Sequence, residues 1–253
     1  MIIDFDPELV AGFLFALVRT GAWIAVAPPF NSNAIPARVK VAISVGLAWI
    51  IAPTFDAGPE VLETWTFIWM LAYQALIGLA LGFVVQLLFA AVQAAGQMID
   101  MAAAFSSASL YDPFSNAAST PMGRLFQIVA ITILFAIDGH LMLVSGLLAS
   151  FEAAPLGGLR IEGLAEFLTT NVTTFFVAAA QIAFPMLAAL FLAEVSLGLL
   201  TRAAPQINIL VIGFNVKVLV LIFLGGMVLA VLPGAVARIV EQAVMAPSGW
   251  LGG

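Results

Sequence analysis

The sequence predicts an all-α protein of about six long apolar helices that crosses a membrane several times. Hydrophobic residues make up 63% of the 253 residues and charged residues only 9%, with a mean hydropathy of +1.15. Soluble domains carry about 25% charged residues, so the composition excludes a soluble globular protein. Apolar stretches long enough to span a bilayer recur along the whole sequence, and no separate soluble domain is visible between them.

Charge and residue usage also exclude several functions. The net charge of -6 leaves no basic patch for nucleic acid, so no nucleic-acid partner is expected. The absence of cysteine and the presence of one histidine exclude thiolate and multi-histidine metal sites. Glycine-rich phosphate loops, serine elbows and HExxH motifs are also missing from the sequence. We therefore expect neither an enzyme nor a cofactor.

The first three apolar segments are predicted from prolines and charge-free runs. Asp6 can cap a helix with Pro7 in its first turn, and Pro28 and Pro29 end it. A second span is expected over about residues 37–52. From Thr64 to Ile99 the third run has no formal charge, and as a straight helix it would reach roughly 54 Å against a hydrocarbon core of roughly 30 Å. This run is too long for one ordinary span.

Three further segments complete the set of six. A helix over about residues 122–150 should be interrupted near Asp138 and His140. The fifth span is expected over about residues 166–200, with a kink at Pro185. The sixth should cover about residues 209–230 and end near Pro233.

Residues 105–116, FSSASLYDPFSN, form the longest polar interruption between apolar runs. Non-helical backbone is tolerated in a bilayer only where protein buries it or where it lines a water-filled cavity. This segment should therefore face a lumen or a partner subunit. Before it, small and polar residues recur at steps of three or four, which places four polar side chains on one helical face, namely Gln86, Gln93, Gln97 and Asp100. Either water or a partner helix could satisfy this polar stripe.

Ionisable residues within or beside apolar segments are candidates for function, because they are costly to place in a bilayer. In addition to Asp100 they are Arg19, Asp138, His140, Glu194, Arg202 and Lys217. One interpretation is a small proton-coupled transporter that uses Asp138, His140 and Asp100. The other is that these side chains pair with one another, with backbone or with another subunit. Pairing is favoured because Asp138 and His140, two residues apart, would point in different directions on a regular helix.

Four stretches resemble the FliR family of flagellar and type III secretion export-gate proteins, whose virulence members are of the SctT type. They are APPFNSNAIPARVKVAIS, the passage from AGQMID to YDP, DGH with the following SFEAAPLG, and LGLLTRAAPQINILVIGFNVKV. The resemblance covers nearly the whole chain, and the last stretch is its most specific part. One departure concerns Gln74, which stands where the family often has an acid and so argues against an ion pair at this point of the third helix.

The resemblance implies one export-gate membrane domain over residues 1–253, with a FliP-like part over 1–160 and a FliQ-like helical hairpin over 161–253. It also implies FliP-type and FliQ-type subunits and an FlhB-type protein as partners, in the flagellar basal body of the bacterial inner (cytoplasmic) membrane. Unfolded flagellar proteins would pass through the gate. The loop over 105–116 would plug its lumen, and the plug residues would be Phe105, Ser106, Ser107, Ala108, Ser109, Leu110, Tyr111, Asp112 and Pro113.

Overall fold

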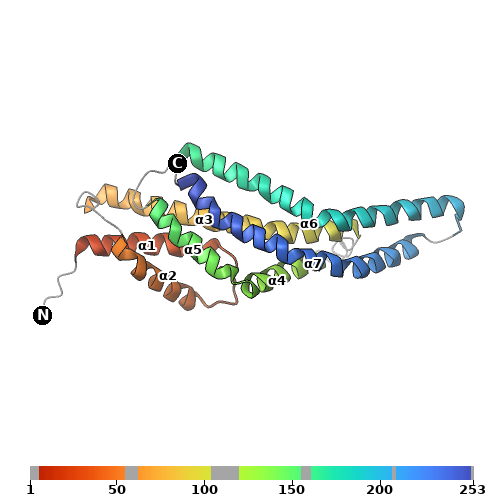
Figure 1. Cartoon of the computed structure of the whole chain (residues 1–253), viewed down its shortest axis with the longest axis horizontal. Coiled ribbons are helices and arrows are strands. Elements are labelled where there is room, and N and C mark those ends of the chain that lie inside the picture. The colour runs from red at the N-terminus through yellow and green to blue at the C-terminus, as the bar shows by residue number, and fades with distance from the viewer. Residues whose placement is uncertain (1–5, 55–61, 104–119, 155–160, 207–208, 252–253) are drawn as a thin grey trace. The chain divides into compact units, whose positions relative to one another are not determined.

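The computed structural model describes residues 6–54, 62–103, 120–154, 161–206 and 209–251, and the regular elements in these ranges are all helices. Figure 1 traces them in chain order: α1 (Pro7–Val26), α2 (Ala37–Ile51), the 3₁₀ helix η1 (Ala52–Thr54), α3 (Thr64–Ala102), α4 (Pro121–Ala136), α5 (Gly139–Ala153), α6 (Ile161–Ala203) and α7 (Ile209–Leu251). The predicted all-α class is confirmed.

Local sequence signals set several helix ends. A side-chain oxygen of Asp6 accepts a hydrogen bond from the Glu8 amide at 3.0 Å, with Pro7 in the first turn, so the predicted start of α1 is confirmed. The predicted interruption near Asp138 is a sharp break, since α4 and α5 meet at 77°. Asp138 has a φ of 55°, a left-handed conformation that a regular right-handed helix cannot accommodate.

Among the described residues, four helices are long and apolar enough to cross a membrane: α1, α3, α6 and α7. The bent pair of α4 and α5 gives a fifth span if both halves belong to one crossing. With 15 residues, α2 extends roughly 22 Å and falls short of a hydrocarbon core of roughly 30 Å. Six spans are therefore not confirmed, and the structure supports four or five. The overlong third run is confirmed, since α3 has 39 residues.

The predicted end of the last helix near Pro233 was wrong, because α7 continues to Leu251. A proline removes one backbone hydrogen bond and often kinks a helix, but it does not end a helix whose following residues pack well. Beyond Pro233 four apolar side chains repeat at helical spacing and are buried, namely Val236, Ile239, Val240 and Ala243. Their burial outweighs the loss of one hydrogen bond.

The chain forms two compact units. The first contains residues 1–87, 138–172 and 240–253. Within it α1 packs on α2, whose buried stripe is Ser44, Ala48 and Ile51. Gly78 and Gly82 of α3 lie against the backbone of α1, where a Cβ on Gly78 would overlap the carbonyl oxygen of Arg19. This close approach lets α1 and α3 share a tightly packed core.

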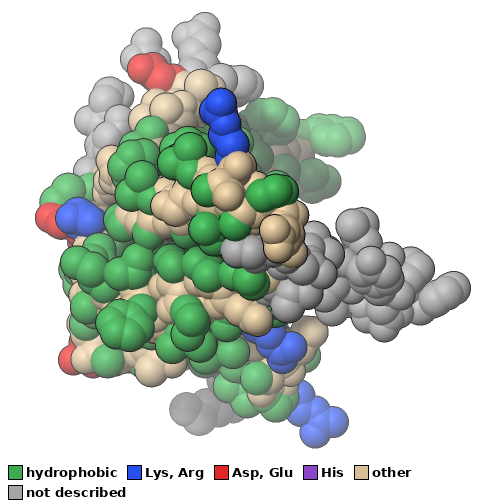
Figure 2. All heavy atoms as spheres, turned by 90° about the vertical axis from the view of Figure 1, so that its right-hand side faces the viewer, with side chains coloured by type: hydrophobic (Ala, Val, Ile, Leu, Met, Phe, Trp, Pro, Cys, Tyr) green, Lys and Arg blue, Asp and Glu red, His purple; other side chains and the backbone are tan. Residues whose placement is uncertain are grey.

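The second unit contains residues 88–137 and 173–239. Its core side chains come from the end of α3, from α4 and from the long hairpin of α6 and α7, and include Leu88, Leu134, Leu190 and Leu232. Only 28% of the apolar window of α6 and 22% of that of α7 is buried. Among the described side chains on the face seen in Figure 2, hydrophobic ones are widespread and charged ones are few. Such a surface needs lipid or another protein to cover it.

Candidate functional site

The predicted plug over 105–116 lies outside the described residues. The helices on either side of it, α3 and α4, are described, and their ends form the candidate site. α3 leads into this stretch at Ala103, and α4 begins at Pro121 after it. Both helix ends belong to the second unit, and they meet at Asp100. We call this place the α3–α4 junction and define it by Gly96, Gln97, Asp100, Thr120 and Gly123.

Asp100 caps α4 from the neighbouring helix. Its side chain is fully buried, and one carboxylate oxygen, Oδ2, accepts hydrogen bonds from the backbone amides of Met122 at 2.8 Å and Gly123 at 3.2 Å. The first amides of a helix have no partner within the helix, and an acidic group there also interacts favourably with the helix dipole. α4 has no side-chain cap of its own, since Thr120 makes no capping bond. Asp100 supplies this cap instead.

Two buried polar atoms at the junction have no hydrogen-bond partner within the part of the chain that the structure describes. They are the second carboxylate oxygen of Asp100, Oδ1, and the hydroxyl oxygen of Thr120. Nearly all buried polar atoms in proteins are hydrogen-bonded. The junction therefore keeps hydrogen-bonding capacity beyond the cap on α4.

Glycines let the two helices cross closely at the junction. A Cβ on Gly96 would lie 2.6 Å from the Met122 carbonyl oxygen and 2.7 Å from the Gly123 Cα. A Cβ on Gly123 would lie 2.9 Å from Cγ of Gln97. Larger residues at Gly96 or Gly123 would push the helices apart and move the Met122 and Gly123 amides away from Asp100.

The predicted polar stripe on α3 becomes progressively more buried toward the junction. Gln86 is exposed, Gln93 and Gln97 are half-buried, and Asp100 is fully buried. The aliphatic part of Gln97 lies beside Gly123 at the start of α4, at the place that a Cβ on this glycine would need. The stripe thus connects an exposed surface of α3 with the buried junction.

Arg19 forms a second polar centre, which lies in the first unit. Its fully buried guanidinium donates from Nε to Oε1 of Gln74 at 2.6 Å, from Nη1 to the Ser150 carbonyl oxygen at 2.7 Å and from Nη2 to the Ala154 carbonyl oxygen at 2.6 Å. The guanidinium carbon also lies 4.2 Å from the centre of the Phe151 ring. These contacts join α1, α3 and the C-terminal end of α5.

All of these Arg19 partners are uncharged groups. The two carbonyls lie at the end of α5, where the helix dipole is negative, and the Ser150 carbonyl oxygen also accepts a hydrogen bond from the Ala154 amide at 3.1 Å. The cation is therefore compensated by aligned dipoles, one amide and an aromatic face. Arg19 could be selected from the sequence, whereas Ser150 and Ala154 could not, because any residue type can supply a backbone carbonyl as acceptor. The unusual Gln74 was the one available signal.

The remaining predicted site residues lie at the start of α5 and on α6 and α7. Asp138 is exposed and His140 half-buried at the start of α5, in the first unit, whereas Asp100 belongs to the second. Nζ of Lys217 on α7 lies 2.6 Å from a carboxylate oxygen of Glu194 on α6. Arg202 is exposed in the last turn of α6. Among the described residues, no group of three or more His, Cys, Asp or Glu is arranged to hold a metal ion.

Comparison with known proteins identifies related chains over most of this length. The model of the family described as "Bacterial export proteins, family 1" matches residues 10–243. The flagellar biosynthetic protein FliR of Escherichia coli K12 is 33% identical over 80% of this chain and 78% of its own. FliR of Bacillus subtilis strain 168 is 31% identical over 84% of each chain. The Yop proteins translocation protein T of Yersinia pestis is 27% identical over 86% of this chain and 85% of its own.

Proposed function

Because this chain belongs to family 1 of the bacterial export proteins, in which FliR and the Yop translocation protein T are its relatives, we propose that it is the FliR-type subunit of a flagellar protein export gate. With FliP-type and FliQ-type subunits it forms a membrane channel that passes unfolded flagellar proteins. The names of the relatives support export, and the flagellar ones among them favour the flagellar system. The role is structural, and no catalytic step is assigned to the chain.

The gate lies in the bacterial inner membrane, at the flagellar basal body, next to an FlhB-type protein. Residues 1–160 correspond to a FliP-like part and residues 161–253 to a FliQ-like hairpin. The long pair of α6 and α7, with its largely exposed apolar surface, suits a hairpin that other subunits and lipid enclose. Isolated chains with so much uncovered apolar surface are prone to aggregate.

Residues 105–116 act as the plug of the channel, and the observation that carries this proposal is the cap from Asp100 to α4. The chain leaves α3 at Ala103 and enters α4 at Pro121, and the Asp100 cap holds these two points together. The 16 residues between Ala103 and Thr120 are thus tied at both ends to one buried junction. A polar segment tied in this way can fill a lumen without being carried away with the exported protein.

The stripe of Gln86, Gln93, Gln97 and Asp100 faces the lumen or a neighbouring subunit. The exposed side chain of Gln86 and the half-buried ones of Gln93 and Gln97 have room for further hydrogen bonds. Replacing both Gln93 and Gln97 by Leu should weaken assembly or export. Normal export by that variant would show that the stripe contributes only to helix packing.

Co-purification tests the proposed function. The tagged chain should be recovered intact from membranes when FliP-type and FliQ-type subunits are co-expressed, and it should be degraded or aggregated without them. A self-sufficient transporter predicts the opposite, namely a folded and active molecule from the chain alone. Recovery of a stable monomer that does not bind the co-expressed FliP-type and FliQ-type subunits would refute the gate assignment.

A further inference from the structure

The exposed face of α5, in the first unit, follows a seven-residue repeat. Exposed residues recur there at steps of three or four, and we call them the α5 seam: Asp138, Leu141, Met142, Ser145, Leu148 and Glu152. Asp138, Ser145 and Glu152 are seven positions apart, as are Leu141 and Leu148. This spacing is typical of a helix that packs lengthwise against a second helix.

The middle of the α5 seam is apolar. Leu141, Met142 and Leu148 are 60%, 42% and 37% exposed. The Ser145 hydroxyl donates to the Met142 carbonyl oxygen at 2.7 Å, so it is already hydrogen-bonded within α5. Because Ser145 is also small, another helix could approach closely here and bury the three apolar side chains.

An acid stands at each end of the α5 seam. Asp138 and Glu152 are 14 positions apart, which is about four helical turns and roughly 21 Å along the helix. Both side chains are exposed. Within the described part of the chain, neither carboxylate makes an ion pair or a side-chain hydrogen bond. Both charges are therefore available to a partner.

Local backbone physics does not account for these two acids. Asp138 has a φ of 55°, which glycine adopts more readily, and its carboxylate makes no capping bond to α5 that would offset the strain. Glu152 lies in the last turn of α5, where the helix dipole disfavours a negative charge. Strained residues persist mainly where function requires them, so Asp138 and Glu152 indicate an external contact.

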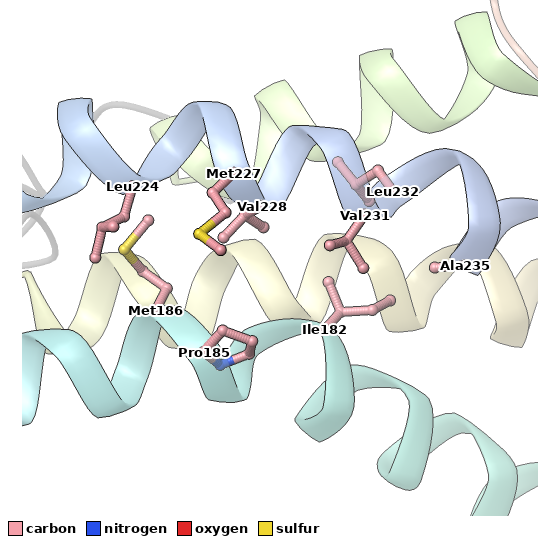
Figure 3. Close-up of a pocket in the computed structure, with 9 residues that line it drawn as sticks. All are labelled: Ile182, Pro185, Met186, Leu224, Met227, Val228, Val231, Leu232 and Ala235. Carbon is pink, nitrogen blue, oxygen red and sulfur yellow. The ribbon is translucent and has the colours of Figure 1, made fainter.

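We propose that the α5 seam docks a helix of another export-gate subunit, one that carries an apolar stripe with Lys or Arg about four turns apart. This inference rests on the gate function proposed above. Opposite charges at the two ends would fix the register of the docked helix, as charge complementarity does at other interfaces. The groove between α6 and α7 differs, because its nine lining side chains are all apolar and specify no charge pattern (Figure 3).

Photo-cross-linking tests the proposal in the assembled gate. The probe is p-benzoylphenylalanine at position 141, in the full chain with both acids intact, co-expressed with FliP-type, FliQ-type and FlhB-type subunits. After irradiation of the purified gate, mass spectrometry identifies the adducts. We expect an adduct on an apolar helix of another subunit, with two Lys or Arg residues about four turns apart. Adducts on lipid alone, or on a helix without such residues, would overturn the proposal.

Charge reversal then tests the two acids. Asp138→Lys together with Glu152→Lys should lower the adduct yield by about tenfold, because like charges would face each other at both ends. Replacing the two basic residues of the partner helix by Glu should restore the yield. The matched control is Glu63→Lys with Glu241→Lys, which changes the net charge equally at two exposed positions outside the seam and should leave the yield unchanged.

The yield also separates this inference from the gate function. An unchanged yield after reversal of both acids would overturn the docking proposal, whereas co-purification of the subunits in the same samples would still support the gate. If the wild-type chain did not assemble with these subunits, both proposals would fail. The adduct on the chain with native acids is scored before any charge is reversed, so misfolding of the reversed chain would not protect the proposal.

Discussion

Nε of Arg19 donates to Oε1 of Gln74 over 2.6 Å, and this bond joins α1 to α3 in the buried core of the first unit. A carboxylate at position 74 would make this contact an ion pair. In this chain the amide accepts the bond, and the carbonyls of Ser150 and Ala154 complete the set. The arrangement makes the stability of this unit depend on hydrogen bonds to one cation.

Removing the cation should destabilise the protein. Arg19→Met removes the guanidinium that donates to Gln74 and to two carbonyl oxygens, and we expect a loss of roughly 3 kcal/mol in unfolding free energy. Titration with dodecyl sulfate in mixed micelles, followed by circular dichroism, measures it. Arg38→Met is the control, because Arg38 is exposed on α2 and its loss should change little. Equal stability of the Arg19 and Arg38 variants would contradict the role of Arg19.

Placing an acid at position 74 should stabilise the same unit. In Gln74→Glu a carboxylate would face the guanidinium, and charge-assisted hydrogen bonds are roughly twice as strong as neutral ones. We expect Gln74→Glu to unfold at a higher temperature than the wild type and Gln74→Leu at a lower one. If Gln74→Glu were the less stable of the two, then Arg19 would not be available to pair with it.

The Asp100 cap predicts a graded series of variants. Asp100→Leu removes the acceptor of the Met122 and Gly123 amides and should cost about 1 to 2 kcal/mol, as lost helix caps do. Asp100→Asn keeps one acceptor oxygen but loses the charge at the helix end, so it should lie between Leu and the wild type. Hydrogen exchange of the Met122 and Gly123 amides reports directly on the cap. Unchanged protection of both amides in Asp100→Leu would show that Asp100 does not cap α4.

The close helix crossing predicts opposite effects of one substitution at two glycines. In Gly96→Ala the new methyl would overlap the Met122 carbonyl oxygen, and we expect a cost of about 1 to 3 kcal/mol. In Gly198→Ala the methyl meets nothing within 4 Å, and the lower backbone entropy of alanine should stabilise α6 by about 0.5 to 1 kcal/mol. Thermal unfolding in detergent distinguishes them. Matching shifts would mean that α3 and α4 do not cross closely at Gly96.

Helix positions could be predicted from the sequence because prolines, caps and charge-free runs act locally. Asp6, Pro28 and the break at Asp138 all lie where such signals placed them. The end of α7 could not be predicted from Pro233, because buried side chains beyond the proline decide whether the helix continues. The length of α2 was nearly right, but a 15-residue helix is too short to be a span.

The candidate site was only half visible in the sequence. Asp100 and Arg19 could be selected because ionisable side chains are rare in apolar helices. Their partners could not be selected, because these partners include backbone groups of Met122, Gly123, Ser150 and Ala154. These groups lie 22 to 135 positions along the chain from the side chains that they bind. Such pairs are set by how the helices cross, which depends on many packing contacts together.

Leakage through the assembled gate tests the central claim most directly. The gate is reconstituted with FliP-type and FliQ-type subunits in liposomes that contain a fluorescent ion indicator, and the wild type is compared with a chain lacking residues 106–112. Loss of the plug should raise the rate of ion entry well above the wild-type rate, whereas deleted and wild-type chains without the other subunits should not differ. Equal ion entry by wild-type and deleted gates, at equal assembly, would contradict the account.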